Sequence, residues 1–177
     1  PKKRKWKIQH IKSTGKGFVP PKKEEEERIQ TEREIIREAR SRIGEIDSAL
    51  YYSGFMRPVN GGRYTGVFGS QRIINGKPQN IHNGLDIAAP IGTPVYAMAD
   101  GYVRLAREDF YYNGTFVLLE HGYGLNSSYL HLNQLFVEEG TFVKKGDLIG
   151  EIGTTGRSTG PHLHWGVQWY DKRIDPA

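Results

Sequence analysis

The chain has 177 residues, enough for one domain with a hydrophobic core and an additional segment. It contains no cysteine, so disulfides and thiolate ligands are excluded and any metal must bind to His, Asp or Glu. The formal net charge is +5, but residues 1–23 hold nine Lys and Arg residues and no acid, whereas residues 51–177 hold eleven charges of each sign. A neutral body argues against nucleic acid as a partner, because nucleic-acid-binding domains normally carry the basic residues themselves.

No apolar run approaches the roughly 20 residues that a membrane-spanning helix needs. The chain begins with Pro1 rather than Met, and we expect it to be a processed form or a fragment of a longer protein. A membrane anchor would then have to precede Pro1. Nothing in the sequence indicates an oligomeric state.

Residues 1–20 combine Lys, Gly, Ser and Pro with few apolar side chains and are predicted to be a basic linker or the remnant of a preceding module. Residues 21–50 are predicted to be a helical segment, with the helix itself over residues 22–43. Pro21 suits the first turn, and glutamates near the start and arginines toward the end match the helix dipole. A thin stripe of isoleucines favours a helix that docks on the domain or acts as a spacer, since a coiled coil needs a longer stripe. A further hypothesis is that this helix covers a groove of the domain.

Residues 51–177 have frequent glycines, short β-branched or aromatic runs, and turn signals about every ten residues. This pattern is typical of an all-β fold, and no helical pattern separates the runs as a parallel α/β sheet would require. We expect Tyr111 and Tyr112, on a loop, either to line a groove or to be exposed aromatics. The expected strands cover residues 64–68, 84–87, 94–97, 101–107, 116–120, 125–131, 148–152 and 162–168.

Two short motifs carry candidate metal ligands. His82 and Asp86 stand four residues apart in one strand-like run, and His162 and His164 stand two apart in another, so each pair is predicted to share a strand face. Two imidazoles and a carboxylate would form a three-ligand zinc site with an open position, which is the arrangement of a catalytic zinc. The proposed ligands are His82, Asp86 and His164, a choice that spacing alone does not settle. His131 and His162 are candidates for proton transfer, because histidine titrates near neutral pH.

These segments together resemble the LytM/lysostaphin-type zinc peptidases, which have a peptidase M23 domain. The resemblance extends over about residues 63–177 and is carried by His82-Asn-Gly-Leu-Asp86, Tyr129-Leu-His131-Leu and Gly153-Thr-Thr-Gly-Arg-Ser-Thr-Gly-Pro-His162-Leu-His164-Trp. It implies a compact, mostly antiparallel β-sandwich of the barrel-sandwich-hybrid kind over residues 51–177, with zinc in a groove. It also implies that His82, Asp86 and His164 bind the metal. The same resemblance implies that His131 and His162 are catalytic.

The resemblance implies an enzyme, a zinc endopeptidase that hydrolyses peptide bonds in peptidoglycan cross-links or stem peptides outside the cytoplasm. We expect D-alanyl–diaminopimelate bonds rather than glycine bridges, and the periplasm of a Gram-negative bacterium, because the chain has a basic extension and no recognisable wall-binding repeat. One alternative is a non-catalytic regulator that binds a cell-wall amidase. The presence of all five candidate site residues argues against this alternative. Another is a carbohydrate- or carrier-type β-domain, which leaves the five residues unexplained.

Overall fold

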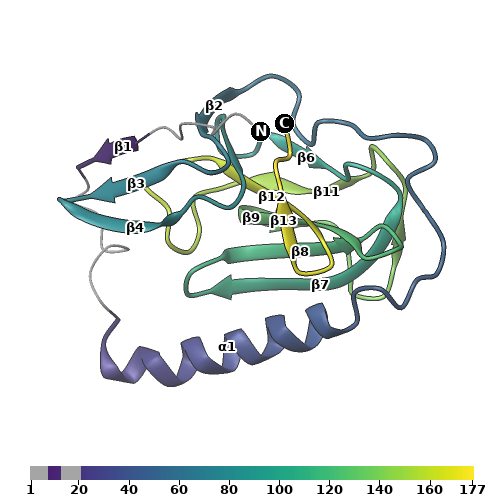
Figure 1. Ribbon diagram of the computed structural model, residues 1–177, viewed down its shortest axis with the longest axis horizontal. Coiled ribbons are helices and arrows are strands. Elements are labelled where there is room, and N and C mark those ends of the chain that lie inside the picture. The colour runs from purple at the N-terminus through teal and green to yellow at the C-terminus, as the bar shows by residue number, and fades with distance from the viewer. Residues whose placement is uncertain (1–7, 13–20) are drawn as a thin grey trace, which may run out of the picture.

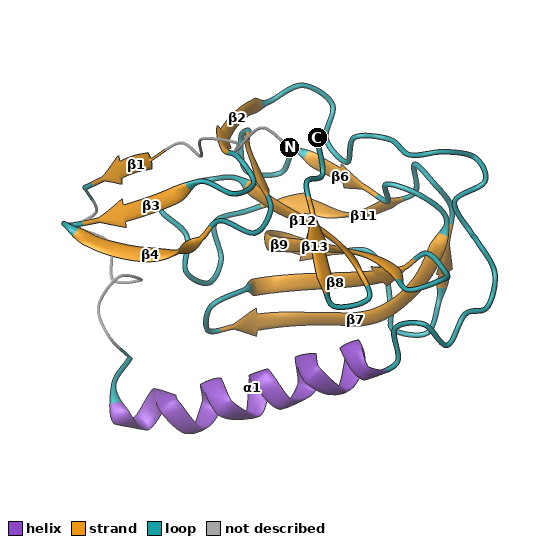
Figure 2. Cartoon of the chain, viewed as in Figure 1, coloured by secondary structure: helices purple, strands orange, loops and turns teal. Residues whose placement is uncertain are grey.

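The computed structural model describes residues 8–12 and 21–177, and this part of the chain forms one helix and thirteen strands (Figures 1 and 2). The helix α1 spans Lys23–Ser41. The strands are, in chain order, β1 Ile8–Ile11, β2 Arg63–Gly66, β3 Gln71–Ile74, β4 Lys77–Ile81, β5 Leu85–Ala88, β6 Pro94–Tyr96, β7 Gly101–Phe110, β8 Gly114–Glu120, β9 Leu125–Leu135, β10 Phe142–Val143, β11 Leu148–Ile152, β12 Leu163–Trp169 and β13 Lys172–Ile174.

Most strands belong to one antiparallel sheet, in the order β10-β7-β8-β9-β12-β5-β2. β11 pairs with both β6 and β9, and β13 pairs with β12. Strand β8 is buried at every position, because both faces of the sheet are covered there. The larger core cluster on one face includes Val95, Leu119, Tyr129, Ile149 and Leu163. This core fixes the strands that carry the candidate site.

Helix α1 runs along β7 and β8 and covers the other face of the sheet (Figure 1). Ala39 is buried there against Leu105 and Phe116, and Ile35 and Ile36 pack at the edge of the same cluster. Burying an apolar side chain completely stabilises a fold by about 1.5–3 kcal/mol. The isoleucine stripe predicted from the sequence therefore docks the helix on the sheet.

A second sheet of three strands, in the order β1-β3-β4, extends beyond one end of the main sheet (Figure 2). The hairpin of β3 and β4 turns at Asn75 and Gly76, whose φ values of 50° and 79° are the left-handed pair of a tight two-residue turn. Strand β1 pairs with β3 in parallel. It lies within the stretch expected to be a linker, of which residues 1–7 and 13–20 are outside the described part.

The mostly antiparallel β-architecture with one helix confirms the predicted fold class. All eight expected strands are present, with ends within four residues of the prediction. The short strands β1, β3, β4, β10 and β13 were not predicted. The division into residues 1–20, 21–50 and 51–177 stays a prediction. Within the described ranges, α1 is too polar to qualify as a membrane-spanning helix.

Candidate metal centre

The register between β5 and β12 places two of the predicted ligands side by side. The strands are antiparallel, and His164 stands opposite Asp86. Opposed residues on neighbouring strands have Cβ atoms about 4.5–5.5 Å apart, so side chains on the same face meet. His164 Nδ1 lies 2.8 Å from Asp86 Oδ1. Gly84 permits this approach, because a Cβ there would lie 2.7 Å from His164 Nε2.

His82 reaches the same point from the loop between β4 and β5. The prediction that His82 and Asp86 share the face of one strand is therefore wrong, although their side chains converge. The chain leaves β4 because the His82 backbone pairs with a turn: its N–H donates to Ser70 O at 2.9 Å and its carbonyl accepts from Gly69 N at 2.8 Å. This pair of backbone hydrogen bonds, the His82 clamp, brings His82 Nε2 to 3.0 Å from Asp86 Oδ1 and 3.1 Å from His164 Nδ1.

The donor atoms of these three residues fit a zinc ion. Their separations of 2.8, 3.0 and 3.1 Å are close to the roughly 3.3 Å that tetrahedral bonds of about 2.0–2.1 Å set between neighbouring donors. Two imidazoles and a carboxylate are also donors that zinc accepts. His82 Nδ1 donates to Val67 O at 3.0 Å, which leaves the Nε2 lone pair for a metal.

The surroundings also keep the donor atoms deprotonated. Burial alone would raise the pKa of the Asp86 carboxyl, but its hydrogen-bond and charge interactions with His164 and His82 bring it well below its usual value. Burial lowers the pKa of His164, and its hydrogen bond with Asp86 only partly opposes that shift. Because a metal ligand must be deprotonated, both shifts favour metal binding near neutral pH.

Arg72, which the sequence did not single out, holds the second carboxylate oxygen. Its Nη2 donates to Asp86 Oδ2, so Asp86 presents Oδ1 to the histidines. Gly66 on β2 leaves room for this pair, because a Cβ there would lie 2.5 Å from Asp86 Oδ2 and would overlap the Arg72 guanidinium. No periodic pattern in the sequence marks Arg72, since its partner Asp86 is 14 residues away and a hairpin separates the two.

A bulge in β9 turns His131 out of the core. Strand β8 pairs Val117 with Tyr129 but Thr115 with Leu132, so β9 contains one extra residue between these pairs. Strict alternation would place His131 on the core face with Tyr129. Instead Tyr129 and Leu132 share the core, and His131 has a φ of 64°. Bulges and left-handed non-glycine residues both occur preferentially at functional sites, where they re-aim a side chain.

Hydrogen bonds orient the two remaining histidines. His131 Nδ1 donates to Thr155 O at 2.8 Å, and His162, which directly precedes β12, donates from Nδ1 to Gly160 O at 2.8 Å. Each ring therefore keeps Nε2 as an acceptor. His162 Nε2 lies 3.9 Å from Asp86 Oδ1, and the ring centroids of His131 and His162 are 4.8 Å apart. Burial, followed by the neighbouring histidines, lowers the pKa of His131 to about 3, so its imidazole is neutral at neutral pH.

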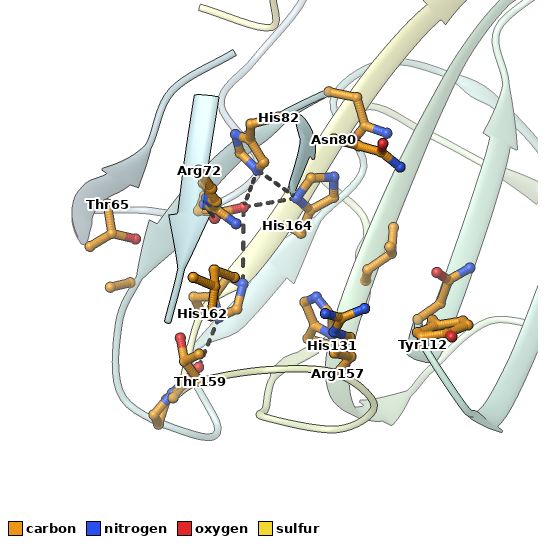
Figure 3. A pocket seen from close by; sticks show the side chains of 18 of the residues that line it. Thr65, Arg72, Asn80, His82, Tyr112, His131, Arg157, Thr159, His162 and His164 are labelled. Atoms are coloured by element: carbon orange, nitrogen blue, oxygen red, sulfur yellow. Dashed lines mark hydrogen bonds and ion pairs between the residues drawn. The ribbon is translucent and has the colours of Figure 1, made fainter. Parts of the chain in front are cut away.

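All five predicted residues line one open groove of about 630 Å³ (Figure 3). Tyr112 also lines it, as do Arg72 and Arg157, which the sequence did not single out as site residues. None of the described residues of α1 lines this groove, because the helix lies against β7 and β8. The hypothesis that the helix covers the groove therefore finds no support in the described part of the chain.

The family model for peptidase family M23 matches residues 80–176, which is more than half of the chain. The chain belongs to peptidase family M23. A solved structure from Pseudomonas aeruginosa, described as an M23 peptidase, has a TM-score of 0.72 and 36% identity, and the match covers 89% of this chain and 62% of that one. A zinc-containing peptidase from Vibrio cholerae has a TM-score of 0.60 and 38% identity over 67% of this chain and 37% of that one.

Among curated proteins, the peptidoglycan DD-endopeptidase ShyA of Vibrio cholerae is 49% identical over 84 residues, or 48% of this chain. That match covers 19% of the length of ShyA, so the similarity to this relative concerns a fraction of a longer protein. Family membership confirms the resemblance to the LytM/lysostaphin-type zinc peptidases that the motifs indicated.

Proposed function

We propose that the protein is a zinc-dependent endopeptidase that hydrolyses peptide bonds in peptidoglycan cross-links. One observation carries the proposal: the donor atoms of His82, Asp86 and His164 converge in a groove that His131 and His162 also line. Three protein ligands beside an open groove are typical of a catalytic zinc, whereas structural zinc sites are closed by a fourth ligand. The family and the name of ShyA support peptidoglycan peptides as the substrate class.

The proposed roles follow from the hydrogen bonds of the groove. When bound, a zinc ion supplies Lewis acidity, which lowers the pKa of water and polarises the scissile carbonyl. We assign His82, Asp86 and His164 to holding it. His131 and His162 each commit Nδ1 to a carbonyl oxygen, so Nε2 can accept a proton from the attacking water and later give a proton to the departing nitrogen. A protonated imidazole here would also stabilise the developing oxyanion.

We further propose the D-alanyl–diaminopimelate cross-link as the bond that is cut, with glycine bridges as the alternative. The name DD-endopeptidase, which ShyA carries, supports a bond between D-centres. An enzyme of this kind works where the polymer is, so we place the protein outside the cytoplasm, in the periplasm of a Gram-negative bacterium. The word peptidoglycan in the name of ShyA supports action outside the cytoplasm.

Digestion of purified peptidoglycan tests the proposal. The protein is assayed as purified, after chelation and after zinc is restored, with His131→Ala alongside, and mass spectrometry of the released fragments names the bond. We expect zinc-dependent release of peptide fragments that His131→Ala abolishes. A protein that binds one zinc per chain and releases nothing would contradict the proposal and favour the non-catalytic regulator.

A further inference from the structure

The groove is more basic than its metal ligands require. Two arginines line it, Arg72 and Arg157. Asp86 is the single carboxylate among the described lining residues, and it is already bonded to Arg72 and two histidines. A cleft lined mainly by one sign of charge concentrates ligands of the other sign. The charge of the groove therefore favours an anionic substrate.

The backbones of Arg157 and His131 are hydrogen-bonded to two residues that are consecutive in the chain, and this places Arg157 next to His131. Arg157 N donates to Tyr112 O at 2.9 Å, and His131 N donates to Asn113 O at 2.9 Å. Thr155, two residues before Arg157, accepts the hydrogen bond from His131 Nδ1. The Arg157 guanidinium carbon lies 5.7 Å from the centroid of the Tyr112 ring, and Figure 3 shows both side chains on the His131 side of the groove.

The turn that leads to Arg157 is held by the sheet. Thr155 Oγ1 accepts a hydrogen bond from Thr115 N at 2.9 Å. Gly156 has a φ of 66° and packs so closely against Gly114 that a side chain has no room. A recognition residue whose backbone is already fixed loses less conformational entropy when a ligand binds. Arg157 is therefore placed in advance beside the histidine.

We propose that Arg157 binds a free carboxylate of the substrate, on the carbon next to the scissile nitrogen. The inference rests on the proposed function of the groove. A guanidinium presents a planar fork of donors that matches a carboxylate. A histidine that protonates the departing nitrogen lies within hydrogen-bond reach of it, so a carboxylate on the adjacent carbon comes close to His131, where Arg157 stands.

This assignment defines the class of substrate as peptides whose departing amine carries an α-carboxylate. In a D-alanyl–diaminopimelate cross-link, the nitrogen that departs is attached to a carbon with a free carboxylate. Inside a glycine bridge the corresponding carboxyl is consumed by the next amide bond, so it carries no charge. Arg157 would thus favour the first kind of cross-link over the second.

Two synthetic cross-linked peptides test the inference, identical except that this carboxylate is free in one and amidated in the other. The kcat/KM of the zinc-loaded protein is measured for each by chromatography of the products. We expect the wild type to prefer the free acid by about 10- to 100-fold, the range for a hydrogen bond between charged groups. In Arg157→Gln the ratio should fall to near 1, and in Arg157→Lys it should lie between the two.

Arg107→Gln is the matched control, because Arg107 lies on β7 outside the groove and should keep the wild-type ratio. Zinc content and thermal unfolding check that each variant is loaded and folded. A wild-type ratio near 1, or a ratio that Arg157→Gln leaves unchanged, would overturn the role of Arg157 while leaving the endopeptidase proposal intact. Cleavage of neither peptide by the wild type would instead contradict the proposed function, and the inference with it.

Discussion

Replacing Arg72 with methionine removes the cation bonded to Asp86 Oδ2 and keeps much of the apolar volume of the side chain. We expect the dissociation constant for zinc to rise about 10- to 100-fold, as when other outer partners of metal ligands are removed. The side chains of Asp86 and Arg72 are only 4% and 24% exposed, so water replaces the guanidinium poorly. A hydrogen bond to a charged group is worth about 1.5–3 kcal/mol, which converts to a similar factor.

Competition with a metallochromic chelator at fixed pH and ionic strength measures this constant. Gly66→Ala should shift it in the same direction, because the added methyl group would displace the Arg72 guanidinium from Asp86. Arg157→Met is the matched control: it removes the same charge from the groove and leaves the Arg72–Asp86 pair in place. A dissociation constant for Arg72→Met within about twofold of the wild type would refute the idea that Arg72 holds the ligand.

Three further predictions follow from other parts of the structure. His131→Ala should lower kcat by about 10²–10⁴-fold, the usual contribution of a general acid–base catalyst. Metal analysis should still find one zinc per chain in this variant. Loss of the zinc would instead indicate that His131 is a ligand. Burial lowers the pKa of His121 to about 4, so below about pH 6.5 the unfolded chain takes up a proton that the folded protein does not. Denaturant unfolding of the chelated protein should therefore show stability falling from pH 6.5 to 5, and His121→Gln should remove about 2 kcal/mol of that fall; equal pH slopes would show that His121 is not responsible. On α1, Glu32 accepts the backbone N–H of Tyr111 at 2.8 Å, so Glu32→Ala should loosen the loop before Asn113 and lower kcat/KM, whereas a gain in activity would revive the idea of an inhibitory helix.

The fold class could be predicted because turn residues and β-branched runs repeat along residues 51–177. The hairpin of β3 and β4 was missed although its turn, Asn75-Gly76, was visible. Its strands are only four and five residues long and protrude from the main sheet, so no clear alternation of buried and exposed side chains marks them. Short strands of this kind are specified by their pairing, which a single sequence does not display.

The candidate site was predictable in its members, and less so in its geometry. All five residues stand in short motifs. Alternation along a strand, however, wrongly places His82 within a strand, although β4 ends before it, and wrongly places His131 on the core face. The bulge in β9 arises from pairing with β8, and the meeting of Asp86 with His164 arises from the register of β5 with β12. Such features depend on contacts between distant segments.

The three predicted metal ligands and His131 are held by different parts of the fold, so a substitution can disrupt one group without the other. Asp86 and His164 depend on the regular register of β5 and β12, and the His82 clamp adds the third donor. His131 depends on the β9 bulge and on the turn at Thr155. Changes to the register should therefore abolish zinc binding and turnover together. Changes to the bulge or the turn should lower turnover in a protein that still binds zinc, and metal content measured beside activity distinguishes these two outcomes.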